Sequence, residues 1–405
     1  MADPGFREMK SQLERALNTA FSPHSPINEA RLFAGRTDQI RAVVDTVQTP
    51  GLHAAIYGER GVGKTSLANI IKEFLGDVVG VSRVNCAQAD TFDSVIRRSL
   101  GAFQLSLSRP QAGFGEREHQ VVKEVVDLLP ADAPLSPDHV AALLAQLPPY
   151  FVLVIDEFDR LAPAQTSAFA DFIKSLSDRG AASTVVLVGV AENINDLIHS
   201  HASIERCLRQ IPLQRMSEAE LKEIIEIGLA TAGFALSSEA PIRRILSVSQ
   251  GFPHYTHLLS QNAARAALDA GQTTISDADV ISGMHTAVER ADQTHRELYY
   301  KATTATRKSN LWKEVVASCA LADSDERGYF ATRAVQDRLS IVLKRPVIQQ
   351  TLAYHLGNLT EESRGPLLAR DGPPRRYRYR FCNPLMRPFI TMKAMSDGMI
   401  EPAAV

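Results

Sequence analysis

The sequence predicts an α/β protein built on a parallel sheet, followed along the chain by an all-helical unit and a smaller mixed unit. Three observations lead to this fold class. Apolar runs without polar alternation recur between helical stretches, a glycine-rich loop joins one such run to a helix, and the pattern turns helical after Met216. With 405 residues, the chain has room for two or three domains.

The strands that would form the sheet are short and rich in Val, Ile and Leu. The run Phe151–Ile155 shows no polar alternation, which is typical of a strand buried on both faces. The connection 105–149 is long and polar, and its glycine- and charge-rich part, 109–118, predicts a mobile loop. We expect strands at residues 53–57, 78–84, 151–155, 184–190 and 211–213, with helical stretches between them.

A glycine-rich loop follows the first strand and precedes a helical stretch at 66–74. It reads Gly58-Glu59-Arg60-Gly61-Val62-Gly63-Lys64-Thr65-Ser66, which matches the pattern of phosphate-binding loops. Glycines let main-chain N–H groups curl around a polyphosphate, and the helix directs its positive end at the same oxygens. Lys64 can reach the β- and γ-phosphates, and the Thr65 hydroxyl can hold Mg²⁺. The loop and its context therefore predict a site for ATP and Mg²⁺.

A pair of carboxylates follows this loop about 90 residues later in the chain. Asp156 and Glu157 follow the apolar strand 151–155 directly. A carboxylate at a strand end is well placed to hold Mg²⁺, and the adjacent one can orient or deprotonate a water molecule. A simple helix cap is the alternative interpretation of the pair.

The strand at 184–190 is expected to bring a further polar group to the same edge of the sheet. Asn193 is the first candidate for sensing the γ-phosphate, and Glu192 is the second. A turn or a helix cap is an equally good interpretation of these residues.

The chain divides into four parts by its patterns. We expect an N-terminal extension at 1–30, a nucleotide-binding core at 31–215, a helical lid at 216–296 and a C-terminal domain at 305–392. The lid opens on Ser217 and Glu220, spaced as a capping box. Its later helices are expected at 241–248, 255–267 and 276–288.

Three helices and a basic hairpin are predicted in the C-terminal domain, which together describe a winged helix. The helices are expected at 311–321, 333–339 and 347–359, and the hairpin turns at 371–374. Double-stranded DNA would meet Gln349 and Gln350 of the third helix and four arginines of the wing, Arg375, Arg376, Arg378 and Arg380. The third helix is not strongly basic, and protein contact is the alternative use of the domain.

Charge and composition narrow the class of protein. The whole chain has a formal net charge of −2, but residues 301–405 carry 17 Lys and Arg against 10 Asp and Glu. This asymmetry favours a nucleic-acid-facing C-terminal part on an acidic core. The four cysteines are far apart, no secretory signal is visible, and no apolar run is long enough for a membrane span. We therefore expect a cytoplasmic protein without a membrane partner.

Residues 25–290 resemble the AAA+ ATPases, and within them the branch of origin-recognition initiators and related prokaryotic ATPases. The loop 58–65 corresponds to Walker A, Asp156-Glu157 to Walker B, and Asn193 to sensor 1. The resemblance implies that Phe33-Ala-Gly35-Arg36 lies along the adenine. It also implies that Arg206, with Arg209 in reserve, is an arginine finger that completes a neighbouring subunit's site in a self-assembly.

The lid departs from many AAA+ proteins because Gln250–Tyr255 contains no sensor 2 arginine. Its Gly-x-Pro pattern is similar to STAND-type signalling ATPases, which implies that Pro253 touches the nucleotide. Our leading hypothesis is an ATPase that associates with DNA under nucleotide control. The alternative is a STAND-like switch whose C-terminal domain binds a protein partner, and a metabolic kinase is a third, less favoured class.

Overall fold

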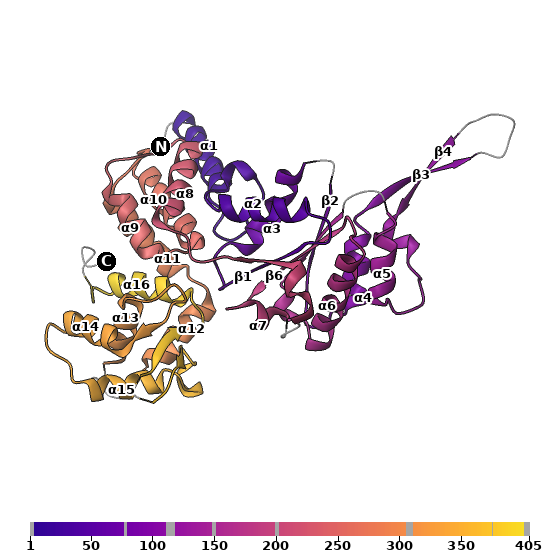
Figure 1. Ribbon diagram of the computed structural model, residues 1–405. Helices are drawn as coiled ribbons and strands as arrows, with labels where there is room; N and C mark the ends of the chain where they lie inside the picture. Colours follow the sequence, from indigo (N-terminus) through magenta and orange to yellow (C-terminus); the bar gives the residue numbers. More distant parts are fainter. Residues whose placement is uncertain are drawn as a thin grey trace.

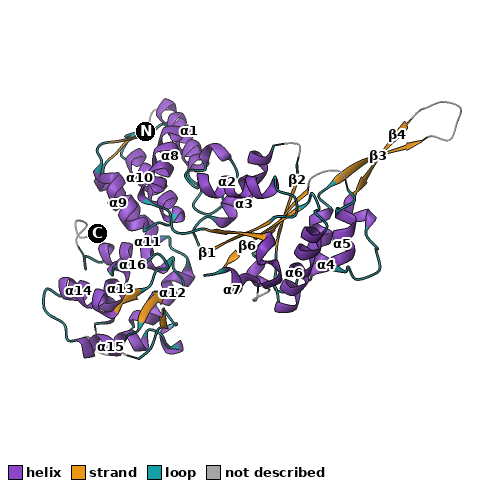
Figure 2. Cartoon of the chain, in the orientation of Figure 1, coloured by secondary structure: helices purple, strands orange, loops and turns teal. Residues whose placement is uncertain are grey.

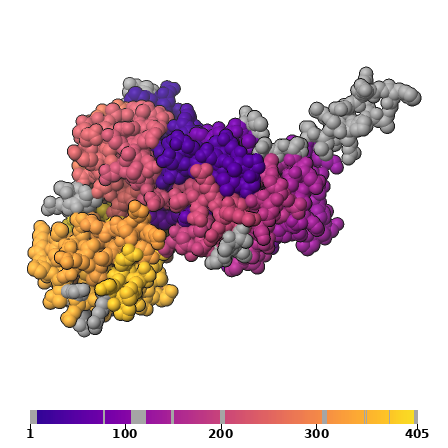
Figure 3. Space-filling view, viewed as in Figure 1, coloured from indigo at the N-terminus to yellow at the C-terminus, as the bar shows by residue number. Residues whose placement is uncertain are grey.

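The computed structural model describes residues 4–76, 79–110, 118–147, 151–198, 202–304, 311–374 and 376–400. Arg375 and the side chain of Gln349 lie outside this description. Figure 1 shows three bodies: a core around the central sheet, a helical lid beside it, and a C-terminal module that contacts both. In the space-filling view the same three bodies meet along continuous surfaces (Figure 3).

The core sheet is parallel and has the order β2-β5-β6-β1-β7. Hydrophobic side chains alternate between its two faces: Ile56, Val154 and Val188 belong to one buried cluster, and Ala55 and Ile155 to another. The predicted parallel sheet is thus confirmed. Its strands are β1 (His53–Gly58), β2 (Gly80–Asn85), β5 (Phe151–Asp156), β6 (Thr184–Val190) and β7 (Leu208–Pro212).

Helices cover both faces of this sheet, so its carboxyl edge is left to form a site. Buried residues of α2 (Thr37–Val47) and α3 (Lys64–Leu75) pack into the first cluster. The second cluster takes residues from α4 (Phe92–Leu100), α5 (Pro137–Leu144), α6 (Pro163–Asp178) and α7 (Ile194–Ile198).

Two strands lie in the connection 105–149, which was expected to be polar and to contain a mobile loop. β3 (Gln104–Pro110) and β4 (Glu118–Glu124) pair antiparallel and project away from the core, as Figure 1 shows. The segment Gln104-Leu-Ser-Leu-Ser does alternate apolar and polar residues, which is the strand signal that its polarity obscured. Phe103 and Val125 anchor the base of the hairpin in the core. Residues 111–117, within the predicted mobile loop, lie outside the described part.

The lid contains α8 (Glu218–Ala232), α9 (Ala240–Ser249), α10 (Pro253–Asp269) and α11 (Asp277–Glu289), with the short strands β8 (Ala235–Leu236) and β9 (Thr274–Ile275). The capping box predicted at Ser217 is formed, and a second one, which was not predicted, is formed at Ser276. The N-terminal extension is a helix, α1 (Pro4–Ala20), which contacts α8 and α10. Leu17 and Phe21 are fully buried in that contact, so the extension completes the lid.

The C-terminal module combines helices with a small antiparallel sheet of order β10-β12-β11 (Figure 2). The last helix, α16, places its methionines in a hydrophobic cluster and contacts α13 and α11. The connecting helix α12 was not predicted. The elements are α12 (Gln293–Thr303), α13 (Trp312–Leu321), β10 (Phe330–Ala331), α14 (Thr332–Val342), α15 (Gln349–Asn358), β11 (Leu368–Asp371), β12 (Arg378–Phe381) and α16 (Met386–Ser396).

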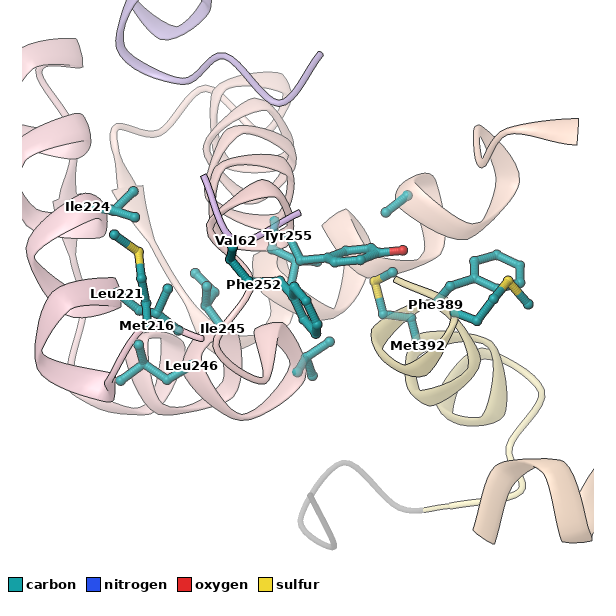
Figure 4. Close-up of a cluster of buried hydrophobic side chains, with 14 of the residues drawn as sticks. Val62, Met216, Leu221, Ile224, Ile245, Leu246, Phe252, Tyr255, Phe389 and Met392 are labelled. Atoms are coloured by element: carbon teal, nitrogen blue, oxygen red, sulfur yellow. The ribbon is translucent and has the colours of Figure 1, made fainter. Parts of the chain in front are cut away.

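The lid and the C-terminal module share one hydrophobic cluster. Figure 4 shows Val62 of the phosphate loop beside Phe252, while Tyr255 extends toward Phe389 and Met392 of α16. Among the described residues, no helix combines the length and the apolar character that a membrane crossing requires.

Candidate nucleotide-binding site

The phosphate loop takes a curled course at the carboxyl end of β1. Gly61 and Gly63 hold φ angles of 89° and 96°, in the left-handed region that favours glycine. A Cβ on Gly58 would lie 2.2 Å from the main-chain oxygen of Leu213, so the chain can leave β1 here only with glycine. Gly63 is the residue before α3, which places the first turn of that helix at the loop.

Lys64 folds back over this loop. Its Nζ donates to the main-chain oxygens of Gly58 and Glu59, at 3.0 and 2.8 Å, and the residue is 8% exposed. Burial lowers the pKa of Lys64 to about 8, although Asp159 and Asp156 oppose that shift. A buried cation held by neutral carbonyl oxygens can turn to a polyphosphate when one is bound.

Arg36 braces the loop from the N-terminal side. It has a left-handed main chain with φ of 61°, and its guanidinium donates to the oxygens of Val62 and Gln214. The N–H groups of Gly35 and Arg36 donate to Glu223 and Glu220 of α8, at 2.9 and 3.2 Å. Both Phe33 and Arg36 line the cavity next to the loop, whereas Gly35 faces the lid helix.

Asp156 stands at the end of β5 and is 2% exposed. Arg83 of the neighbouring strand β2 donates to its Oδ2 at 2.7 Å, and the N–H of Glu157 donates to its Oδ1 at 2.8 Å. Thr65 and Asp156 line the same cavity, and both offer hard oxygen donors that suit Mg²⁺. Within the described ranges, no cluster of three or more His, Cys, Asp and Glu offers a separate metal site.

Glu157 has a left-handed main chain, with φ of 55°, and its carboxylate accepts from Arg160 at 2.7 Å. Such a conformation costs about 1–3 kcal/mol for a residue with a side chain and is typical of functional sites. Glu157 and Arg160 both line the cavity. The ion pair therefore holds the second carboxylate at the rim of the site.

Asn193 lies away from this cavity in the described structure. Its side chain accepts from the N–H of Asp196 at 3.1 Å and donates to the carboxylate of Asp196, which makes it the cap of α7. At the end of β6 the cavity is lined by Gly189 and Val190. A role for Asn193 in sensing the γ-phosphate stays a prediction.

The lid closes the other side of the cavity, whose volume is about 670 Å³. Pro253 is the first residue of α10, and its Cγ lies 3.8 Å from the position of a Cβ on Gly63. The residues predicted to bind the nucleotide thus converge, apart from Gly58, Glu59 and Gly35, which shape the wall without lining it. The predicted residues that line the cavity are Arg36, Arg60, Gly61, Val62, Gly63, Lys64, Thr65, Ser66, Asp156, Glu157 and Pro253.

Glu59 points from the phosphate loop to the segment that leads into the lid. Arg215 donates to both of its carboxylate oxygens, at 2.5 and 3.1 Å, and lies 4.6 Å over the Phe252 ring. Leu385 of the C-terminal module lies so close to Gly61 that a Cβ there would be 2.6 Å from it. The tip of the loop is therefore in contact with both the lid and the C-terminal module.

The two candidates for an arginine finger lie on the surface before and within β7. The Arg206 side chain is 75% exposed and pairs with Asp178 at 3.0 Å, while Arg209 pairs with Asp45 at 3.6 Å. Neither lines the cavity of its own chain. A role of either residue as an arginine finger stays a prediction.

The candidate DNA-contacting residues are divided by their environment. Arg376, Gln350 and Arg378 are all exposed, and Arg378 pairs with Asp325 at 2.9 Å. Arg380 forms an ion pair with Glu192 of the core. The β11–β12 hairpin is thus held to the core by one of the arginines predicted to contact DNA.

Sequence reasoning missed several residues of the site. His257, Arg83, Arg160, Arg215 and the segment 22–27 have no motif that marks them. For Arg83 a signal existed, because a polar residue on the strand next to a buried carboxylate is a candidate partner. Arg160 comes to the site with Glu157, three residues earlier in the core, whereas His257 and the segment 22–27 come to it only through the packing of the lid and the N-terminal extension.

Comparison with known proteins places this geometry in a family. The family described as Novel STAND NTPase 1 matches residues 21–352. Similar solved structures include Cdc6p from Pyrobaculum aerophilum, at 16% identity and a TM-score of 0.47 over 95% of this chain and 99% of that one. The Aeropyrum pernix ORC1 protein in complex with DNA has 14% identity and a TM-score of 0.46 over 95% and 97%. No curated protein matches the chain.

The Walker-type ATPase of Pyrococcus abyssi is 13% identical, with a TM-score of 0.51 over 91% of this chain and 98% of that one. A likeness at this identity concerns the fold alone. The family match spans the core, the lid and most of the C-terminal module. The chain therefore belongs to the Novel STAND NTPase 1 family.

Proposed function

We propose that this protein is an ATP-binding and ATP-hydrolysing switch whose C-terminal module changes its contacts with nucleotide state. The observation that carries the proposal is the cavity at the carboxyl edge of the sheet. There the phosphate loop, the Asp156-Glu157 strand end and the lid residue Pro253 face one space of about 670 Å³. A volume of this size is ordinary for a small-molecule site.

Each residue has a defined task in this proposal. Main-chain N–H groups of the loop and Lys64 would bind the phosphates, and Thr65 and Asp156 would hold Mg²⁺. When bound, Mg²⁺ neutralises charge on the phosphates. The Glu157 carboxylate takes the proton of the attacking water once the ion pair of that carboxylate with Arg160 has opened. Arg206 would supply a positive charge to the site of a neighbouring copy, and Asn193 would have to leave its cap on α7 to serve the γ-phosphate side.

The proposed domain division follows the same logic. Residues 31–215 form the core, 216–296 the lid and 305–392 a winged helix, while α1 from the extension 1–30 buttresses the lid. The order of α13, α14 and α15 and the antiparallel β11–β12 pair support the winged-helix assignment.

The test of the switch is a comparison of nucleotide binding and hydrolysis. Glu157→Gln should bind ATP with an affinity close to that of the wild type and hydrolyse it at least 100-fold more slowly. Lys64→Ala should lose binding. Equal turnover by Glu157→Gln and the wild type would remove Glu157 from the proposed role.

DNA association is a second function that we propose for the C-terminal module. It is favoured by the exposed Arg376 at the turn of the β11–β12 hairpin, in a part of the chain that carries excess positive charge. Reversing Arg375 and Arg376 to Glu should weaken binding to a duplex and reduce its salt slope by about two. Reversing Arg41 and Lys72 of the core changes the net charge equally and should leave the slope unchanged. If the wild type shows no salt-dependent binding to duplex, the module instead serves a protein partner.

A further inference from the structure

His257 is a buried polar side chain in the lid without a partner. It lies on α10, is 4% exposed, and neither Nδ1 nor Nε2 has a hydrogen-bond partner in the described structure. Buried polar groups are nearly always paired, so a histidine with two free ring nitrogens requires an explanation. His257 also lines the nucleotide cavity.

The position of His257 along the cavity is set by its helix. Pro253, one turn earlier on α10, lies against Gly63 of the phosphate loop. The ring of Phe21 meets the His257 ring edge-on, with centroids 5.8 Å apart. Phe21 is followed directly by the segment 22–27, which lines the cavity together with Phe33. One turn of α10 therefore separates His257 from the residue that lies against the phosphate loop, and His257 lines the cavity on the side that Phe21 and the segment 22–27 adjoin.

The surroundings on this side of the cavity suit a flat, partly apolar group with polar edges. Phe33, Met216 and Ile224 supply apolar lining, and His254 is already bonded to the main-chain oxygen of Pro23 at 2.7 Å. A nucleotide held by its phosphates at the loop would extend its base toward this lining. His257 would then supply hydrogen bonds at the base edge.

We propose that His257 reads the base edge of the bound nucleotide and sets its preference for adenine. This inference rests on the proposed function and adds the residue that selects the base. A neutral imidazole has one donor and one acceptor, and adenine offers an exocyclic amine beside ring-nitrogen acceptors. Burial lowers the pKa of His257 to about 4, so the ring is neutral near pH 7.

The test pairs base analogues with variants of the full-length chain. Calorimetry is done with Mg·ATP, with purine riboside triphosphate, which lacks the amine, and with 7-deaza-ATP, which lacks one ring nitrogen. In the wild type at least one analogue should bind about tenfold more weakly than ATP. In His257→Leu that analogue and ATP should bind equally, and His257→Gln, which keeps a donor and an acceptor, should retain part of the difference.

His285→Leu is the matched control, because His285 is an exposed histidine of α11 outside the cavity. The variant His285→Leu should keep the wild-type ratio between the affinity for the analogue and the affinity for ATP. If ATP fails to bind the wild type, the proposed function itself fails. If ATP binds, but the affinity for each analogue relative to ATP is the same in the wild type and in His257→Leu, the proposal for His257 is overturned.

A second measurement covers the case in which His257→Leu does not fold. In wild-type protein labelled at the imidazole nitrogens, addition of Mg·ATP should shift the ¹⁵N resonance that is missing in His257→Gln. A resonance that stays in place while ATP binds contradicts base recognition by this residue.

Discussion

At the scale of single residues, burial lowers the pKa of Lys64. A bound polyphosphate favours the charged ammonium and raises the pKa of Lys64 above its value of about 8 in the free site. Affinity for Mg·ATP should therefore be constant below pH 8 and fall as the pH rises through that value, because binding then takes up a proton. Calorimetry across this range is the measurement, and a flat profile would contradict the lowered pKa.

The Glu157–Arg160 pair makes a second prediction at this scale. Arg160→Ala removes the partner that holds the Glu157 carboxylate at the cavity rim. Basal ATP hydrolysis should rise a few-fold, since the carboxylate is freed to approach water, whereas ATP affinity should change less than twofold. Because Arg160 also lines the cavity, a large loss of affinity would show instead that it binds the nucleotide.

Some residues of the site can be predicted from the sequence, and others cannot. Lys64, Thr65 and Asp156 could be found because phosphate chemistry requires these types at fixed places relative to a strand and a helix. His257 has no such signal, since its relation to the loop depends on how α10 packs against α1 and the core. Asn193 illustrates the converse: a polar residue beyond a strand end can as well cap the next helix.

At the scale of elements, α1 is an integral part of the lid. Phe21, just beyond its end, is fully buried, and a Cβ on Gly228 of α8 would lie 2.4 Å from its ring. Phe21→Ala should lower the free energy of unfolding by about 3–5 kcal/mol. Met9 of the same helix is 48% exposed, so Met9→Ala should change the free energy of unfolding by less than about 0.5 kcal/mol. Urea unfolding of both variants is the measurement, and equal midpoints would contradict the docking of α1.

Element types were predictable where one physical signal dominated. The unbroken run Phe151–Ile155 and the capping box at Ser217 correspond to β5 and to the start of α8. The β3–β4 hairpin and α12 were missed because polar residues hide their periodicity. Their formation depends on anchoring at Phe103 and on contacts with α13 and α16, which a local pattern does not contain.

At the scale of the whole molecule, the C-terminal module is held to the core by charge. Arg380 of β12 pairs with Glu192, which follows the core strand β6. Glu192→Gln should free this arginine, so affinity for duplex DNA should rise and its salt slope should steepen by about one. Glu205→Gln carries the same charge change at an exposed core position and should have no effect. Unchanged binding by Glu192→Gln would separate this pair from DNA association.

The phosphate loop connects these scales, because Glu59 pairs with Arg215 and Gly61 abuts Leu385 of the C-terminal module. A ligand that fills the loop acts directly on both contacts. The account depends on one claim, that the loop binds a nucleoside triphosphate. Titration calorimetry of the purified, folded chain with Mg·ATP tests it most directly. We predict saturable heat that is lost in Lys64→Ala, and the absence of heat with the wild type, or equal heat with both proteins, would contradict the account.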